Sequence, residues 1–233
     1  NCHVEKINFE NKKATSVSYW KNNKLVTVKA NKEIILSAGS VGSPQILQAS
    51  GIGDPKKLSD LGISIINNSK GVSKNLQYHL MFRPVYKLKN IKTLNKKINS
   101  IFGKLMIGME YVFFRRGPMT MGASQLCGFA KSDSSRTTPN LQFHVQPIST
   151  DKLGGSNLHN FDAFTPTVAN IRPTSKGEIN IISKDSRENP KIKMNYLSSD
   201  EDRKVAAAGL KLIRKIVLES NEFKKYEPEE FRP

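Results

Sequence analysis

The feature that most constrains the fold is an apolar run that ends in glycine and is followed by a helix signal. Residues 33–38 read EIILSA without polar alternation, which predicts a strand covered on both faces of a parallel sheet. Gly39 ends the run, Ser43 and Pro44 predict a helix start, and Gly51 predicts its end. This spacing also suits an ordinary α/β crossover, but it would let a helix N-terminus approach an anion.

The basic composition does not by itself point to a polyanion. The 233 residues carry a formal net charge of +17, and 37% of them are hydrophobic, enough for a core. The lysines are spread along the chain in runs that rarely exceed two, which favours a solvated basic surface. No nucleic-acid partner is therefore predicted, although a basic nucleic-acid-binding module stays open as an alternative.

The cysteines and the apolar runs limit the classes of site and location. Cys2 and Cys127 form no CxxC motif and have no histidine at metal-ligand spacing, so we predict no metal site and a reducing compartment. No apolar run approaches the ~18 residues of a membrane span. The chain starts at Asn1 and stops at Pro233 soon after a predicted helix, so we expect an internal fragment of a longer polypeptide.

Hydrophobic periodicity predicts two regions of different architecture. Residues 4–30 alternate as an antiparallel meander, with turns at Asn11 and at Asn22 and Asn23. A short helix is predicted over 54–62 and a strand over 63–66. After His79 we expect a strand over 81–88, a long amphipathic helix over 95–114, and a helix that begins at Ser199. Further strands are predicted over 126–130, 141–145, 165–171 and 178–183.

Several motifs in order resemble the glucose-methanol-choline (GMC) oxidoreductase family. Residues 39–53, GSVGSPQILQASGIG, are similar to its second signature, and the preceding KEIILSA, GVSKNLQYH at 71–79 and RPTSKG at 172–177 continue the resemblance. Residues 190–202 resemble the family's C-terminal region. The resemblance covers nearly the whole chain and is nearest to the bacterial choline dehydrogenase-like and alcohol dehydrogenase (acceptor) flavoproteins.

The resemblance implies an α/β fold, α+β overall, with FAD as cofactor. Residues 1–80 would form part of a Rossmann-like FAD-binding domain. Residues 81–233 would form a substrate domain with a mostly antiparallel sheet and flanking helices, and the family's C-terminal region would start at about 172. By position, Val4 would contact the adenine through its backbone, and Ser37, Ala38 and Gly39 would pack near the adenosine. Val4 could equally be an ordinary strand residue.

The substrate pocket is also implied by position. Gln125 would face the flavin where choline-oxidising relatives are thought to use a glutamate, and a glutamine cannot supply that charge. His159 and Phe164 would lie among pocket-lining residues. For His79 a structural role is expected over catalysis. Ser73 stands where glycine is usual, which argues against a left-handed turn there.

Two motifs of the family have no match in this chain. The Gly-x-Gly-x-x-Gly phosphate loop and the His-Pro-x-Gly-Thr-like segment with the catalytic histidine are both missing, so no catalytic residue is assigned here.

The implied function is therefore that of an enzyme fragment. The parent would oxidise the CH–OH group of choline or another primary alcohol to the aldehyde by hydride transfer to flavin, and pass electrons to a non-NAD acceptor. We expect the fragment alone to be inactive. A cytoplasmic location, with peripheral contact at the inner face of the bacterial membrane, fits these relatives. A flavin-binding relative without catalysis is the alternative.

Overall fold

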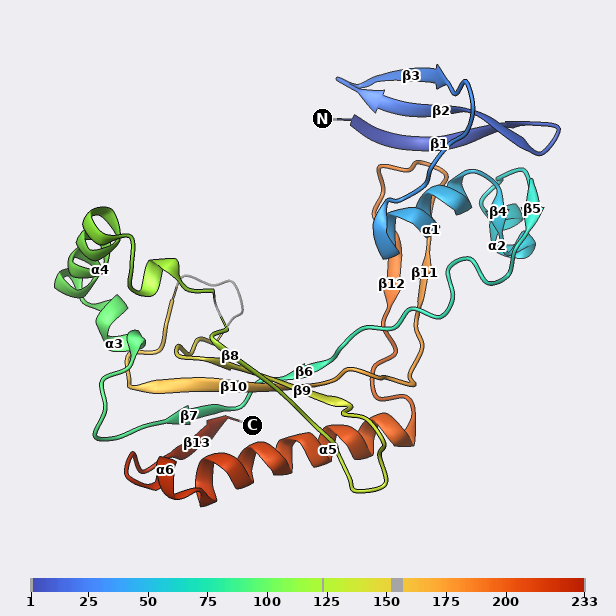
Figure 1. Ribbon diagram of the computed structural model, residues 1–233. Coiled ribbons are helices and arrows are strands. Elements are labelled where there is room, and N and C mark those ends of the chain that lie inside the picture. Colours follow the sequence, from blue (N-terminus) through green and yellow to red (C-terminus); the bar gives the residue numbers. More distant parts are fainter. Residues whose placement is uncertain (1, 123, 152–156, 233) are drawn as a thin grey trace. The chain divides into compact units, whose positions relative to one another are not determined.

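The chain divides into two compact units, which are described one at a time. Figure 1 shows the computed structural model, which describes residues 2–122, 124–151 and 157–232. Unit 1 comprises residues 1–78 and 174–198, and unit 2 comprises residues 79–173 and 199–233. The segment 174–198 thus packs with the N-terminal residues. The assignment of 1–80 to FAD binding and of 81–233 to substrate binding stays a prediction.

Unit 1 begins with the expected antiparallel meander. Its strands are β1 (Cys2–Glu10), β2 (Lys13–Lys21) and β3 (Lys24–Lys29), in the order β1-β2-β3. Asn11, Asn22 and Asn23 all have positive φ at the two tight turns. Asparagine tolerates this left-handed conformation, which matches the right-handed twist of the flanking strands.

The helix of the signature, α1 (Gly39–Ala49), begins five residues before Pro44, its predicted first residue. Pro44 lies inside the helix rather than at its first position, and the Ser43 hydroxyl accepts a hydrogen bond from the Ala38 N–H at 3.0 Å. Gly51 follows the helix with a φ of +85°. A Cβ at Gly51 would lie 2.3 Å from the Ser64 carbonyl oxygen, so the chain needs glycine at this stop.

The strand predicted before α1 was wrong. Residues 33–38 form no strand, and Ile35 is 80% exposed. A parallel strand exists only with hydrogen-bonded neighbours, and within the described residues no strand pairs with this segment. The apolar run therefore has the composition of a buried strand without the partners that would make it one.

Short elements complete unit 1. The predicted second helix is present as α2 (Pro55–Asp60), and the Asp54 side chain accepts a hydrogen bond from the Lys56 N–H at 3.0 Å. The strand expected over 63–66 lies later, where β5 (Asn67–Asn68) pairs in parallel with β4 (Ile52–Gly53). The strand expected over 178–183 is shorter: β11 (Glu178–Asn180) forms a hairpin with β12 (Lys191–Lys193).

Unit 2 is built on an antiparallel sheet, as predicted. Its order is β13-β7-β10-β9-β8, and β6 also pairs with β10. The strands are β6 (Met81–Phe82), β7 (Val85–Lys87), β8 (Leu126–Ala130), β9 (Leu141–Gln146), β10 (Ala163–Asn170) and β13 (Glu229–Arg232). The strand expected over 81–88 is split at Pro84, because proline has no N–H for the ladder.

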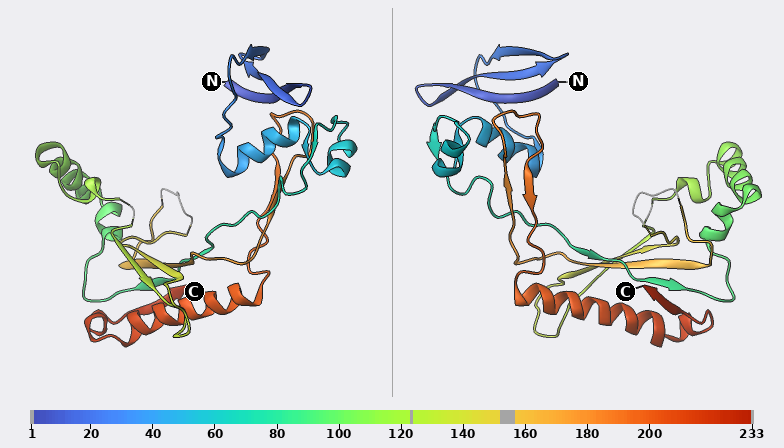
Figure 2. Two further views of the ribbon diagram at one scale, coloured as in Figure 1. Left: turned by 45° about the vertical axis from the view of Figure 1, so that its right-hand side comes forward. Right: turned by 180° about the vertical axis from the view of Figure 1, so that it is seen from behind.

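One long helix covers one face of this sheet (Figures 1 and 2). This helix, α5 (Asp200–Arg214), starts at Ser199, whose hydroxyl accepts a hydrogen bond from the Asp202 N–H at 3.1 Å. It continues through the π-helical turn η2 (Lys215–Glu219) to α6 (Asn221–Lys224). The buried core between helix and sheet contains Tyr86, Leu141, Phe164, Val168, Val205, Ile213 and Val217.

The predicted amphipathic helix over 95–114 is two helices. α3 (Leu94–Asn99) and α4 (Ile101–Phe114) meet at Ser100, which caps α4. The 3-10 turn η1 (Pro118–Thr120) follows. The apolar side chains expected to pack are mostly exposed, including Ile101 at 87% and Phe102 at 70%. In the part of the chain that the structure describes, no helix is both long and apolar enough to span a membrane.

Candidate functional site

The candidate cofactor site is the open backbone at the amino end of α1. Ser37, Ala38 and Gly39 are exposed, and Gly39 has a φ of +76° with no heavy atom within 4 Å of the position of a Cβ. No side chain caps the first turn of α1 at Ala38. Free N–H groups at a helix N-terminus, beside a glycine without a side chain, can approach a polar or anionic group closely.

A cavity of about 320 Å³ lies beside this end of the helix. We call it the amino-end cavity, and it is lined by Ser40, Pro44, Ser73, Lys74, Asn75, Leu76, Gln77 and Ile179. Ser73 is buried with a φ of +80°, and its carbonyl accepts a hydrogen bond from the Ile179 N–H at 2.8 Å. The expectation that serine would exclude a left-handed turn here was therefore wrong, because β11 holds the turn in place.

The charges around the amino-end cavity are largely compensated. Glu178 accepts hydrogen bonds from Lys74 and from Lys57, and the latter is 3.3 Å long. Hydrogen bonds with Lys74, Asn180 and Lys57, in decreasing order of effect, lower the pKa of Glu178 to about 2. Because Lys74 already has a carboxylate partner, the helix backbone is the main attraction for an anion at this cavity.

Val4 lies half-buried on β1, opposite Tyr19, and does not line the amino-end cavity. The start of β1 is nevertheless tied to α1 through one carbonyl group. His3 Nε2 lies 2.7 Å from the Ser186 carbonyl oxygen, and Gln45 Nε2 donates to the same oxygen at 2.9 Å. The structure thus connects the strand of Val4 to the middle of α1, while the predicted adenine contact stays a prediction.

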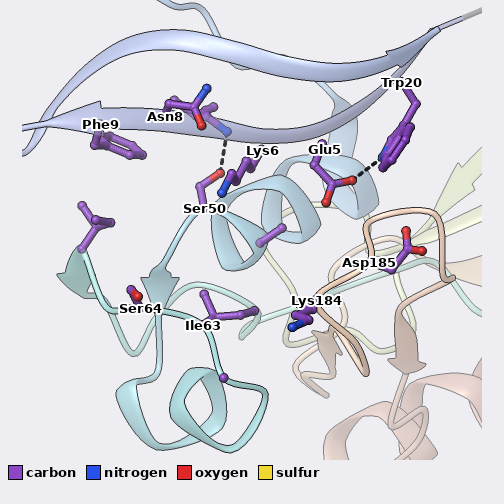
Figure 3. Close-up of a pocket in the computed structure, with 14 residues that line it drawn as sticks. Glu5, Lys6, Asn8, Phe9, Trp20, Ser50, Ile63, Ser64, Lys184 and Asp185 are labelled. Carbon is purple, nitrogen blue, oxygen red and sulfur yellow. Dashed lines mark hydrogen bonds between the residues drawn. The ribbon is translucent and has the colours of Figure 1, made fainter. Parts of the chain in front are cut away.

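A larger cavity of about 580 Å³ lies between β1 and the carboxyl end of α1 (Figure 3). Here the Ser50 hydroxyl accepts a hydrogen bond from the Ile7 N–H at 2.8 Å, and Glu5 accepts one from Trp20 Nε1 at 2.5 Å. Val4 and residues 37–39 do not line this cavity. Size alone therefore does not make it the cofactor site.

The structure of unit 2 separates two predicted pocket residues. Phe164 shares the face of Val168 that packs on α5, and its ring is stacked on Phe223 at 5.4 Å between centroids. Gln125 lies just before β8, and its side chain is exposed. His144 and Thr167, which pair across β9 and β10, alternate with the α5 face and so lie on the other face, which we call the open face. Contact of Phe164 with substrate stays a prediction that its burial in the core does not favour.

His159 is held in place by hydrogen bonds on both ring nitrogens. Nδ1 lies 3.0 Å from the Ser149 hydroxyl, and Nε2 lies 2.7 Å from Asp151 Oδ1. The ring stacks on Phe161 with centroids 4.8 Å apart. The hydrogen bond from His159, helped by the charge of Arg232, lowers the pKa of Asp151. Substrate contact by His159 stays a prediction.

Sequence reasoning missed Arg83, which lies between β6 and β7. Its Nη2 donates to Gln146 Oε1 at 2.6 Å, while its buried Nε has no hydrogen-bond partner among the described residues. The only sequence signal was an arginine before Pro84 in an apolar stretch. Across the described residues, no group of three or more histidine, cysteine, aspartate or glutamate side chains could hold a metal ion.

The chain shares its fold with part of each of two solved structures. Formate oxidase aligns with a TM-score of 0.88 at 21% identity, covering 98% of this chain and 44% of that chain. An FAD-dependent oxidoreductase from Chaetomium thermophilum aligns with a TM-score of 0.85 at 22% identity, covering 100% of this chain and 46% of that chain. At these identities the likeness concerns the fold alone.

The chain belongs to the GMC oxidoreductase family. Two models described as GMC oxidoreductase match residues 1–81 and 173–232, together more than half of the chain. FAD is therefore the cofactor that the family implies, and the exposed glycine turn at α1 fits the approach of such a ligand.

Curated relatives are similar over most of this chain. The oxygen-dependent choline dehydrogenase of Pectobacterium atrosepticum is 34% identical over 214 residues, which is 92% of this chain and 38% of the relative. The alcohol dehydrogenase [acceptor] of Pseudomonas putida is 34% identical over 218 residues, which is 92% of this chain and 39% of the relative. The chain thus spans less than half the length of these relatives.

Proposed function

We propose that this chain is part of an FAD-dependent oxidoreductase that oxidises the CH–OH group of choline or another primary alcohol to the aldehyde. The observation that carries the proposal is the open backbone of Ser37, Ala38 and Gly39 at the amino end of α1, within the stretch that resembles the family signature. The relatives named for choline and alcohol dehydrogenation support the substrate class.

We assign the candidate residues of unit 1 to the cofactor and those of unit 2 to the substrate. The backbone of Ser37, Ala38 and Gly39 would lie against the adenosine, and Val4 would contact the adenine. FAD, when bound, supplies the acceptor for the hydride that leaves the alcohol carbon. The role of this chain is then to bind and orient, because it carries no match to the family's histidine segment.

On the substrate side, Gln125 is exposed just before β8 of the unit 2 sheet. It would orient the alcohol by hydrogen bonds without adding charge. His159 has both ring nitrogens engaged by Ser149 and Asp151, which favours a role in fixing the loop near the substrate over proton transfer. Phe164 would support the same sheet from its α5 side.

The test uses the full-length protein that contains this chain, purified and scanned for flavin absorbance. We expect bound FAD and reduction of a dye acceptor, without NAD, when primary alcohols including choline are supplied. A Gly39→Val variant should retain less flavin, about tenfold or more, because a β-branched residue at a φ of +76° costs roughly 1–3 kcal/mol. Gly71→Ala, at an exposed glycine with open space around it, is the matched control. A flavin that stays oxidised with every alcohol would refute the proposed reaction.

We further propose a cytoplasmic protein with peripheral contact at the inner face of the bacterial membrane. The exposed apolar side chains of α4, accompanied by the exposed cations Lys97, Lys104 and Arg115, support contact with an anionic bilayer. Flotation with phosphatidylglycerol vesicles tests this. A Phe102→Ser, Phe113→Ser double variant should float less than the parent, whereas equal flotation of both proteins would contradict the contact.

A further inference from the structure

The open face of the unit 2 sheet carries one arginine whose environment differs from that of the other arginines. Phe82 pairs with Val168 on the α5 face, so the next residue, Arg83, points toward the open face. Val145 and Pro166 pair on the α5 face. The next pair along the two strands, Gln146 with Thr165, therefore lies on the open face. The hydrogen bond between Arg83 and Gln146 confirms this arrangement.

Arg83 is partly desolvated, and no carboxylate of the described residues forms an ion pair with it. Burial lowers the pKa of its guanidinium, and its Nε has no acceptor among those residues. Six other arginines form ion pairs with carboxylates: Arg116, Arg136, Arg187, Arg203, Arg214 and Arg232. A buried donor without a partner is costly, and a guanidinium presents a planar fork that matches a carboxylate.

Arg83 is linked to the candidate substrate residue Gln125 through a short polar chain. Gln146 accepts from Arg83 and donates to the Ser124 hydroxyl at 3.4 Å. The next residue, Gln125, is anchored by its N–H to the Val145 carbonyl at 3.0 Å. The register also places other titratable groups on this face: His144 and Cys127 across β9 and β8, and Lys87 and Glu229 across β7 and β13. Glu229 lies opposite Lys87, and within the described residues no ion pair joins it to Arg83.

We propose that Arg83, held by Gln146, binds an anionic group of the substrate, so that the alcohol oxidised is a hydroxy acid with a carboxylate. This inference rests on the proposed function and names its substrate class. A carboxylate would supply the acceptors that the guanidinium lacks, in a charge-assisted, fork-like contact. A trimethylammonium group would meet a cation at Arg83 and an uncharged amide at Gln125, so this face disfavours choline.

The experiment measures binding and turnover separately on the FAD-loaded full-length protein. Calorimetric titration of acetate, ethanol and tetramethylammonium tests the charge preference without any oxidation step. Steady-state dye reduction then compares glycolate, ethanol and choline as donors. Both measurements are repeated on Arg83→Gln, on Arg83→Lys, which keeps the charge but not the fork, and on Lys131→Gln, which removes an exposed charge from the same unit.

We expect the wild type to bind acetate and to prefer glycolate, with the effect of Arg83→Gln confined to the carboxylated ligands. Loss of a hydrogen bond to a charged group corresponds to roughly 10- to 100-fold in the Kd for acetate and the KM for glycolate. The Kd for acetate and the KM for glycolate of Arg83→Lys should lie between those of the wild type and Arg83→Gln, and those of Lys131→Gln should match the wild type. If the Arg83→Gln variant does not fold, the preference of the wild type among acetate, ethanol and tetramethylammonium still tests whether the site binds an anion.

Three outcomes overturn the inference: preference for choline or tetramethylammonium in the wild type, no measurable binding of acetate, or equal losses for glycolate and ethanol in Arg83→Gln. Failure of the proposed function looks different, because no donor would then reduce the flavin while acetate binding could still depend on Arg83. Acetate binding that disappears in Arg83→Gln without any flavin reduction would support the anion site and refute the reaction.

Discussion

Replacing Gly177 by alanine should destabilise unit 1 by about 2–4 kcal/mol. A Cβ there would lie 2.1 Å from the Lys193 carbonyl oxygen and 2.7 Å from that of Met194, and backbone atoms cannot rotate away. Relief requires Gly177 to move, which disturbs its two hydrogen bonds with Leu76, of 2.7 and 3.1 Å. Loss of one of these hydrogen bonds, at about 1 kcal/mol, together with overpacking at about 1–3 kcal/mol gives this estimate.

Urea unfolding followed by the fluorescence of Trp20, the single tryptophan and a residue of unit 1, measures the effect. With an m-value of about 2 kcal/mol/M, the midpoint should fall by roughly 1–2 M. Gly71→Ala is the control, because Gly71 is exposed and no atom lies within 4 Å of its added methyl. Midpoints that coincide for the two variants would refute the argument that Gly177 is required by the close approach of residues 193 and 194.

Three further predictions follow from named contacts. Ser50→Ala removes the acceptor of the buried Ile7 N–H and should lower the stability of unit 1 by about 1–3 kcal/mol in the same urea assay, with Ser59→Ala as an exposed comparison. Burial first, and then the nearby Glu230, raise the pKa of Tyr86 to about 12. The contribution of Tyr86 to stability is therefore full below pH 10 and is lost as the pH rises to 12. Measured by thermal unfolding, Tyr86→Phe should lose less stability over that interval than the wild type, and equal losses in the two proteins would contradict this role of Tyr86. The hydrogen bond from Lys74 lowers the pKa of Glu178 to about 2. The contribution of Glu178 to stability is therefore present above pH 4.5 and is lost as the pH falls toward 2. Glu178→Gln should flatten that part of the acid-unfolding curve, and an unchanged curve would contradict this role of Glu178.

Local patterns in the sequence predicted most of the secondary structure. The asparagine turns, the Ser199 cap, the glycine stop at Gly51 and the alternating strands of unit 2 depend on neighbouring residues, and all are present. The family resemblance likewise rests on contiguous motifs and was confirmed. The wrong predictions occur where the local conformation depends on segments distant in the sequence. Residues 33–38 lack paired neighbours, and Ser73 keeps a left-handed turn because the Ile179 N–H bonds its carbonyl.

The sequence by itself therefore determined the family, the helix and strand types, and the glycine turn before α1, because each follows from residues close together in the chain. Only the tertiary structure decided which face of the unit 2 sheet each residue occupies. It placed Phe164 in the core and joined Arg83 to Gln146 across 63 positions of sequence. The physical reason is strand register, which long-range pairing fixes and which reverses every side chain when it shifts by one residue.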